Sequence, residues 1–209
     1  MVNPPHPNRE NYYHVLAGVL PTGSLVVTAL GNASYLWSVV REAAENFYLE
    51  DAMGLALPLA LGLAVAQPTR EIVVVEGDGG FLMHMGGLVT VAAAAPDNLT
   101  VLLIDNGMHG ASGGQALASQ DLDFVGLGRA TGLNSSERIE TEEGFQIALA
   151  RAFETSGPSF LALATAPDIE VVAPPVWRDP IEIKRRFMEA IGTPRYVPTL
   201  FGGGMLGGS

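Results

Sequence analysis

The sequence predicts an α/β fold with a doubly wound, mostly parallel sheet. Short apolar segments, of which 71–76 (EIVVVE) and 99–105 (LTVLLID) are the clearest, alternate with longer segments of helical periodicity. An apolar segment of helix length joins these two, so we expect a βαβ unit with parallel strands. Repeated alternation of this kind is typical of a parallel sheet that helices cover on both faces.

The remaining elements follow from the same patterns. The apolar run 52–66 contains Pro58 and is shorter than the roughly 20 residues that span a bilayer, so we expect a buried helix. Segment 141–157 begins with acidic residues and ends at Gly157-Pro158, which is typical of helix ends. The expected elements are helix 9–20, strand 24–30, helix 34–45, helix 53–66, the βαβ unit, helix 121–133 closed by Gly132, helix 141–157, strand 159–166 and helix 180–192.

Composition limits the classes of protein. The 209 residues are 48% hydrophobic and 16% charged, which favours one compact domain. We expect this domain at 1–192, followed by a Gly/Pro-rich tail at 193–209 that is loose or crosses onto a partner subunit. The net charge of −11 argues against nucleic acid or an anionic membrane as partner.

The sequence lacks cysteine and lacks the pattern of a secretory signal, which limits the possible chemistry and the expected location. The chain contains no cysteine, so disulfides, thiolate zinc sites, cysteine nucleophiles and iron–sulfur ligation are excluded. The first residues show neither the basic region nor the apolar core of a secretory signal, so a cytoplasmic location is expected.

The βαβ unit carries polar residues at both strand ends. Gly77-Asp78-Gly79-Gly80 follows the first strand, and Asn106 follows the second. Because the carboxyl ends of parallel strands meet at one edge, Asp78 and Asn106 should lie together in the crevice where such sheets bind ligands. Glycines at a helix N-terminus let backbone N–H groups approach a phosphate, and carboxylate and amide oxygens suit Mg²⁺.

Other interpretations of this unit exist. Asp78 could be a plain turn aspartate and Asn106 a cap at the strand end. A dinucleotide or P-loop site is excluded, because neither the full GxGxxG nor GxxxxGK[ST] is present.

Four motifs in order resemble one family. The 26 residues from Gly80 to Asp105 match the GDG-to-Asn spacing of thiamine-diphosphate-dependent enzymes. Segment 46–64 (NFYLEDAMGLALPLALGLA) resembles the segment that cups the aminopyrimidine, 31–34 (GNAS) the first phosphate loop, and 106–115 (NGMHGASGGQ) the loop after the metal ligands. The chain thus resembles the pyrophosphate-binding half of these enzymes.

This resemblance implies a set of site residues. Mg²⁺ would be bound by the Asp78 carboxylate, the Asn106 side-chain oxygen and the Met108 carbonyl, with two diphosphate oxygens and a water. Asp105 departs from the family's usual asparagine, and could compete for the metal or cap the strand. The implied cofactor-binding residues are Gly31, Asn32, Asp51, Met53, Gly77, Asp78, Gly79, Gly80, Asn106, Met108, Gly110 and Ala111.

Among these residues the resemblance implies particular contacts. The N–H groups of Gly80 and Ala111 and the side chain of Asn32 would contact the diphosphate. Met53 would force the two cofactor rings into a V, and the Asp51 carbonyl would accept a hydrogen bond from the 4′-amino group. Met53 also suits a helix core, and the two roles are compatible.

The remaining titratable residues give one catalytic candidate. His109, in the loop beyond the metal ligands, is the acid–base candidate, whereas His84 suits an ordinary helix histidine. In the family, a glutamate on a pyrimidine-binding domain activates the cofactor. Because 209 residues leave no room for that domain, a separate pyrimidine-binding subunit and a hetero-oligomer are expected. The glutamates without matching context, interpreted as surface or helix-end charges, are Glu42, Glu45, Glu50 and Glu76.

Within the family, the segments resemble those of phosphonopyruvate decarboxylases and sulfopyruvate decarboxylase β subunits. This implies a lyase that converts a small 3-substituted 2-oxo acid into an aldehyde and CO₂. These enzymes usually have a basic residue after the first phosphate loop, where this chain has Ser34-Tyr35-Leu36-Trp37. Arg41 could take the place of that basic residue. Alternatively, the aromatic side chains could suit a less anionic 2-oxo acid as substrate. Carboligation of the acetolactate-synthase type and a non-catalytic, partner-stabilising subunit stay open, although intact Asp78 and Asn106 count against the latter.

Overall fold

A parallel sheet forms the centre of the computed structural model, which describes residues 6–118, 121–167, 179–192, 196–197 and 204–205. Its strands are β1 (Leu25–Thr28), β2 (Asn46–Tyr48), β3 (Ile72–Gly77), β4 (Leu99–Asp105), β7 (Ser136–Ile139) and β8 (Ser159–Ala164). Within the described residues the sheet is six-stranded, in the order β2-β1-β3-β4-β8-β7, and each neighbouring pair is parallel. The predicted fold class is confirmed.

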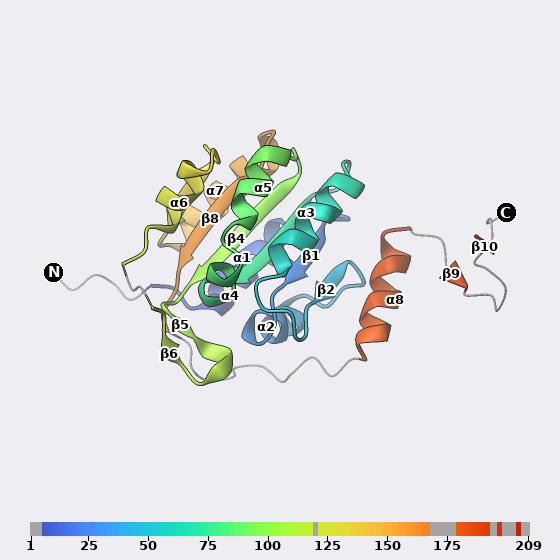
Figure 1. Cartoon of the computed structure of the whole chain (residues 1–209), viewed down its shortest axis with the longest axis horizontal. Helices are drawn as coiled ribbons and strands as arrows, with labels where there is room; N and C mark the ends of the chain where they lie inside the picture. The colour runs from blue at the N-terminus through green and yellow to red at the C-terminus, as the bar shows by residue number, and fades with distance from the viewer. Residues whose placement is uncertain (1–5, 119–120, 168–178, 193–195, 198–203, 206–209) are drawn as a thin grey trace.

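Helices cover both faces of this sheet (Figure 1). The helices are α1 (Arg9–Val19), α2 (Asn32–Val40), α3 (Ala56–Ala66), α4 (Asp78–Met83), α5 (Gly87–Ala94), α6 (Phe124–Ala130), α7 (Glu142–Glu154) and α8 (Pro180–Ala190). On one face, edge-to-face ring pairs join α1 to α7 and α1 to α2. On the other, Phe81 of α4 packs against Phe124 of α6, in the layer that also contains α3 and α5. Among the described helices, none is long and apolar enough to cross a membrane.

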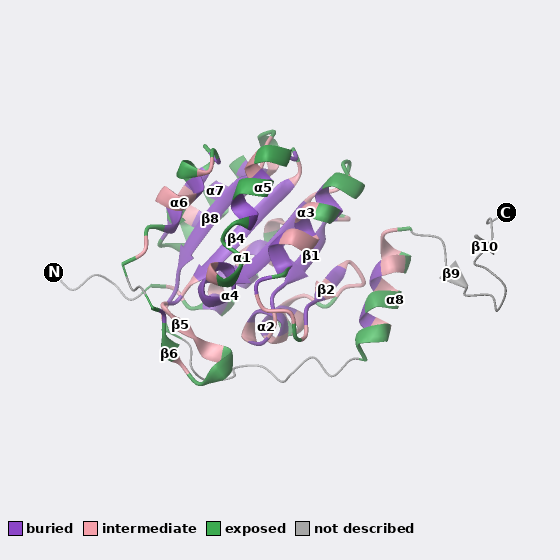
Figure 2. Ribbon diagram, viewed as in Figure 1, coloured by how far each residue is buried: buried purple, intermediate pink, exposed green. Residues whose placement is uncertain are grey.

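The core lies on both faces of the sheet, as Figure 2 shows for the purple strands. Every residue of β1 and β8, and all of β3 and β4 except their last residues, is buried. Burial on both faces explains why these strands have continuous apolar sequences rather than alternating ones.

The edges of the sheet differ from the prediction. Helix α2 ends at Val40, and residues predicted to continue it lead into the edge strand β2. The other edge strand, β7 (SERI), was not predicted. Edge strands are buried less, so they lack the apolar run that reveals a central strand.

Two predicted helices also have different bounds. The helix expected at 53–66 begins at Ala56, so Met53 lies in the preceding turn and the helix-core interpretation of Met53 is wrong. The apolar helix expected after Gly80 is divided into α4 and α5, with His84 as the C-cap residue of α4.

Short elements complete the described chain. β5 (Met108–His109) and β6 (Gln115–Ala116) pair as an antiparallel hairpin that contains a 3₁₀ turn, Gly110–Ser112. In the predicted tail, β9 (Tyr196–Val197) pairs with β10 (Gly204–Met205). The rest of 193–209 lies outside the described residues.

Candidate functional site

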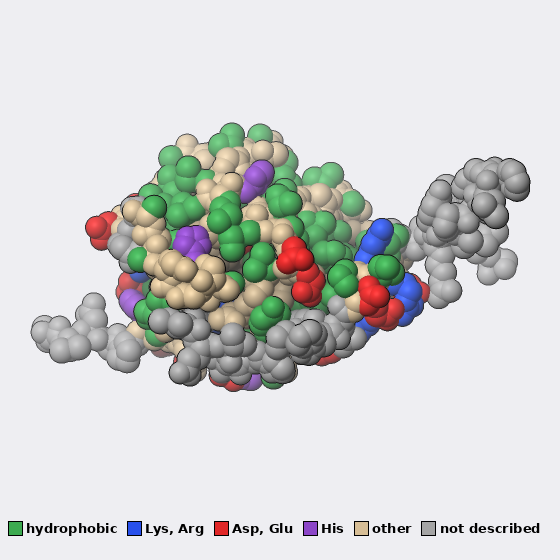
Figure 3. All heavy atoms as spheres, turned by 60° about the horizontal axis from the view of Figure 1, so that its bottom comes forward, with side chains coloured by type: hydrophobic (Ala, Val, Ile, Leu, Met, Phe, Trp, Pro, Cys, Tyr) green, Lys and Arg blue, Asp and Glu red, His purple; other side chains and the backbone are tan. Residues whose placement is uncertain are grey.

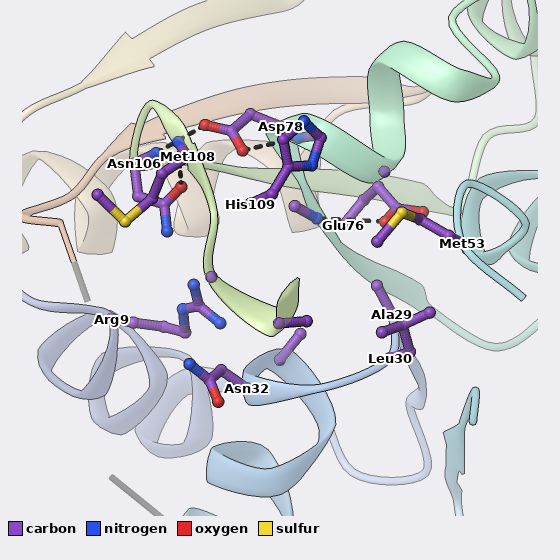
Figure 4. A pocket seen from close by; sticks show the side chains of 16 residues that line it. Arg9, Ala29, Leu30, Asn32, Met53, Glu76, Asp78, Asn106, Met108 and His109 are labelled. Carbon is purple, nitrogen blue, oxygen red and sulfur yellow. Dashed lines mark hydrogen bonds between the residues drawn. The ribbon is translucent and has the colours of Figure 1, made fainter. Parts of the chain in front are cut away.

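A pocket opens at the carboxyl edge of β1, β3 and β4 (Figure 4). Its empty space, part of which is open solvent, is about 540 Å³. The pocket is lined by Arg9, Ala29, Leu30, Asn32, Ala33, Met53, Glu76, Gly77, Asp78, Gly79, Gly80, Asn106, Met108, His109, Gly110 and Ala111.

Most of the predicted site residues are therefore together in one pocket. Gly31 and Asp51 are the predicted residues that do not line it. Gly31 is nevertheless close, because a Cβ atom added to it would lie 3.1 Å from the Cβ of Ala111. Asp51 is exposed in the turn before α3.

Asp78 joins the two strand ends that the motif predicted would meet. It is the first residue of α4 and is only 1% exposed. Its Oδ2 accepts hydrogen bonds from the N–H groups of Asn106 (3.0 Å) and Gly107 (2.7 Å), and its Oδ1 accepts from Gly79 (2.7 Å). Asp78 thus does more than cap a turn, because it fixes the end of β4 against the turn after β3.

Asn106 caps the strand end and also lines the pocket. Its Oδ1 accepts from the N–H of Met108 at 3.1 Å, which is the local cap that the alternative interpretation expected. The same side chain lines the pocket beside Asp78 (Figure 4).

The charge of Asp78 is costly at this depth. Burial raises the pKa of the Asp78 carboxyl, the Gly107 and Gly79 N–H groups oppose that rise, and nearby Asp105 adds to it. A buried carboxylate needs a partner, and a divalent cation would supply one. The residues present fit Mg²⁺, because carboxylate, amide and backbone carbonyl oxygens are hard ligands.

The remaining ligands of the metal would have to be oxygens other than those of carboxylate side chains. In the described part of the chain, no group of three or more His, Cys, Asp or Glu side chains could hold a metal ion. Asp105 is directed elsewhere, because its Oδ2 accepts from Arg138 Nη1 of β7 at 2.6 Å. Asp105 thus pairs with the edge strand β7, an interaction that neither of the two roles left open for it had anticipated.

Glu76 corrects the interpretation of the glutamates. It is 1% exposed, it accepts from the N–H of Gly77 at 3.2 Å, and burial raises its pKa to about 7. The prediction of a surface or helix-end charge is therefore wrong for Glu76. Its place within a strand that is buried on both faces was the available signal.

Glu42 and Glu50 differ from Glu76 and from each other. Glu42 is exposed and pairs with Arg186 of α8 at 2.8 Å, as a surface charge would. Glu50 is partly buried, and burial together with Asp51 raises its pKa.

Of the two candidate histidines, His109 lines the pocket and His84 does not. The His109 ring packs against Gly79 so closely that a Cβ atom on Gly79 would clash with Nδ1, and it lines the pocket. His84 is exposed and does not line it.

Close approach of two segments fixes the position of Met53. Gly54 has φ +79°, and a Cβ atom there would lie 2.8 Å from the Gly80 carbonyl oxygen. Only glycine combines this backbone conformation with this contact. Met53, next to it, reaches the pocket wall near Glu76 (Figure 4).

Arg9 is the charged pocket residue outside the family's motifs that sequence reasoning missed. It belongs to the first turn of α1, is 8% exposed and lines the pocket. No motif surrounds it, and 69 residues separate it from Asp78 in number, so no spacing could reveal it. Arg41, the predicted substitute for a basic residue, follows α2 and does not line the pocket.

A family model for the C-terminal cofactor-binding domain of thiamine pyrophosphate enzymes matches residues 31–163. The chain belongs to this family. The matched residues include every predicted site residue and exclude Arg9.

Individual relatives of this thiamine pyrophosphate enzyme domain agree. Phosphonopyruvate decarboxylase of Streptomyces viridochromogenes is 35% identical over 189 residues, which are 90% of this chain and 47% of the relative. The chain thus spans about half the length of that enzyme. Sulfopyruvate decarboxylase subunit beta of Methanothermobacter thermautotrophicus is 35% identical over 84% of this chain and 91% of the subunit.

Solved structures show the same fold. Benzoylformate decarboxylase of Polynucleobacter necessarius superposes with a TM-score of 0.69 at 21% identity, over 81% of this chain and 34% of that one.

Proposed function

We propose that the chain is the pyrophosphate-binding, β-type subunit of a thiamine-diphosphate- and Mg²⁺-dependent decarboxylase. The reaction would convert a small 3-substituted 2-oxo acid, of the sulfopyruvate or phosphonopyruvate type, into an aldehyde and CO₂ without oxidation. The observation that carries this proposal is the position of Asp78. Its buried carboxylate accepts hydrogen bonds from the N–H groups of Asn106 and Gly107. It lies in a pocket that residues of segments 31–34, 77–80 and 106–115 line. The names of the two 35% identical relatives support the reaction class.

Each part of the pocket has a proposed task. Asp78, Asn106 and the Met108 carbonyl bind Mg²⁺, and Met53 with the Asp51 carbonyl orients the rings. When bound, thiamine diphosphate supplies the carbon that attacks the 2-oxo group and the electron sink for loss of CO₂. The residues proposed to surround the diphosphate are Gly31, Asn32, Gly77, Gly79, Gly80, Gly110 and Ala111.

His109 is proposed to move the proton that the product needs. Its imidazole lies at the pocket wall against Gly79, within the space that the cofactor would share with substrate. An imidazole can donate or accept a proton near neutral pH.

A separate pyrimidine-binding subunit is proposed to supply the activating glutamate and to cover the pocket. One relative carries the name subunit beta. Apolar side chains are exposed on the turn before α3, on α4 and α5, and between these two helices: Leu55, Met83, Met85 and Val89. Figure 3 turns this side forward, and hydrophobic and uncharged atoms make up most of its described surface.

Two narrower predictions stay with this proposal. We propose a cytoplasmic location, and we propose that the cofactor-binding domain extends over residues 1–192, with 193–209 as its tail.

The metal assignment is tested by the Asp78→Asn variant of the chain assembled with its partner. The change keeps the size of the side chain and removes its charge, so Mg²⁺-dependent affinity for thiamine diphosphate should fall by about 100-fold or more, above the effect of losing an outer-shell partner. Isothermal calorimetry measures this, and Asp97→Asn, at an exposed aspartate of the α5–β4 loop, is the control. Unchanged affinity in Asp78→Asn would reject the assignment.

The reaction is tested by product analysis of the assembled enzyme. Sulfopyruvate, phosphonopyruvate or a close analogue should give aldehyde and CO₂ in equal amounts. Carboligated products alone, across a panel of such acids, would replace the decarboxylase with a carboligase.

A further inference from the structure

Arg9 brings a positive charge into the pocket from outside the motifs. Among the described residues that line this pocket, Arg9 is the one arginine or lysine, whereas Asp78 and Glu76 are carboxylates. At 8% exposure Arg9 is a buried residue of the pocket wall, and its charge lies where few charged side chains are found.

Arg9 lies at one end of the pocket. Figure 4 shows its side chain extending from α1 toward the space between Asn32 and the segment Asn106–Met108. Met53 and Glu76 lie at the opposite side of the same view. Since the proposed cofactor is elongated, with its rings at Met53, its phosphate end would extend toward Arg9.

We infer that Arg9 binds the terminal phosphate of thiamine diphosphate. This inference rests on the proposed function. A terminal phosphate carries about −1.5 to −2 charges near pH 7, and a guanidinium matches phosphate oxygens with two parallel hydrogen bonds. Mg²⁺ at Asp78 would neutralise one side of the diphosphate, and Arg9 the other.

Arg9 would also help an acidic protein to bind an anionic cofactor. The chain has a net charge of −11, so its overall field repels an anionic cofactor. A cation inside the pocket acts at short range, where the field of distant surface carboxylates is screened by salt. The backbone N–H groups of the loops then orient a phosphate that Arg9 has already attracted.

The test compares thiamine diphosphate with thiamine monophosphate, which lacks the terminal phosphate. Both are titrated with Mg²⁺ by calorimetry into the chain assembled with its partner subunit. In Arg9→Met, affinity for the diphosphate should fall by about 10- to 100-fold, as for a lost charge-assisted hydrogen bond, while affinity for the monophosphate stays unchanged. Arg9→Lys, which keeps the charge without the fork, should fall between wild type and Arg9→Met.

The control is Arg151→Met, which removes the same charge from the exposed face of α7, where Arg151 pairs with Glu137. It should alter neither affinity. Equal losses for both ligands in Arg9→Met would assign Arg9 to the fold and overturn the inference. A rise only in the KM for the 2-oxo acid would assign it to substrate and also overturn it. If wild type binds neither ligand, the proposed function itself fails.

Discussion

Asp78 shows how one side chain can shape a pocket before any ligand enters it. Its two oxygens accept three backbone N–H groups, from Gly79, Asn106 and Gly107. These bonds hold the turn after β3 and the end of β4 at a fixed separation. Because a carboxylate oxygen has two lone pairs and Oδ1 accepts one of these bonds, Oδ1 keeps a lone pair for the proposed metal, which would bind without breaking them.

Glu71 provides a residue-scale prediction on pH dependence. Burial raises its pKa to about 7, opposed by a 2.9 Å hydrogen bond from Thr100. The folded state therefore holds the proton more tightly than the unfolded state. This contribution to stability is fully present below about pH 4.5 and is lost as pH rises through about 7.

Glu71→Gln cannot ionise, so it should be more stable than wild type at pH 8, by about 1–2 kcal/mol after allowing for partial exposure. Thermal unfolding should show the difference between the two proteins disappearing near pH 4.5. Glu76 titrates in the same range but is present in both proteins, so the difference isolates Glu71. A constant difference across pH would show that Glu71 is not responsible.

Among the elements, the central strands were predictable and the edges were not. β3 and β4 are buried on both faces, so their apolar runs identified the sheet and the βαβ unit, and with it the meeting of Asp78 and Asn106. β2 and β7 each have one neighbour in the sheet, and their mixed sequences carry no such signal.

The site residues were likewise predictable in part. Residues within the βαβ unit and its loops could be placed by spacing. Arg9 could not, because α1 reaches the pocket through tertiary packing, mainly against α2 and α7. Glu76 was misinterpreted because a charged side chain is ordinarily exposed, although its place in the continuously apolar strand β3 was a signal that it would be buried.

A pair of glycines tests how the turn before α3 fits against the turn after β3. Gly54→Ala should destabilise the protein and weaken cofactor binding, because its φ is +79° and the new Cβ would lie 2.8 Å from the Gly80 oxygen. Gly62→Ala, inside α3 with open space around the Cβ position, should stabilise it by about 0.5–1 kcal/mol. Thermal unfolding and calorimetry measure both. Changes of the same sign would contradict the packing described.

For the whole molecule, apolar side chains are exposed on both layers of helices. Val89 of α5 is 58% exposed on the layer that contains α3, α4 and α6, and Ile147 of α7 is 59% exposed on the layer that contains α1 and α2. Both are β-branched residues on helix surfaces, so they form a matched pair for locating the partner.

Val89→Glu should weaken association with the pyrimidine-binding subunit by at least about 10-fold, because a charge would be buried in an apolar contact. Ile147→Glu should leave association unchanged. Sedimentation velocity of the mixed subunits measures both, and decarboxylation should rise only as the complex forms. The opposite ranking of the two variants would place the partner on the α1–α7 layer.

The distance in sequence between the pocket residues has a consequence for folding. Arg9, Asn32, Asp78 and Ala111 meet only when α1 and the parallel strands are assembled, and parallel pairing between distant segments forms slowly. We therefore expect the pocket to be completed late in folding. A ligand that binds such a late structure cannot accelerate folding, and instead slows unfolding. Thiamine diphosphate would thus prolong the lifetime of the folded chain without helping it to form.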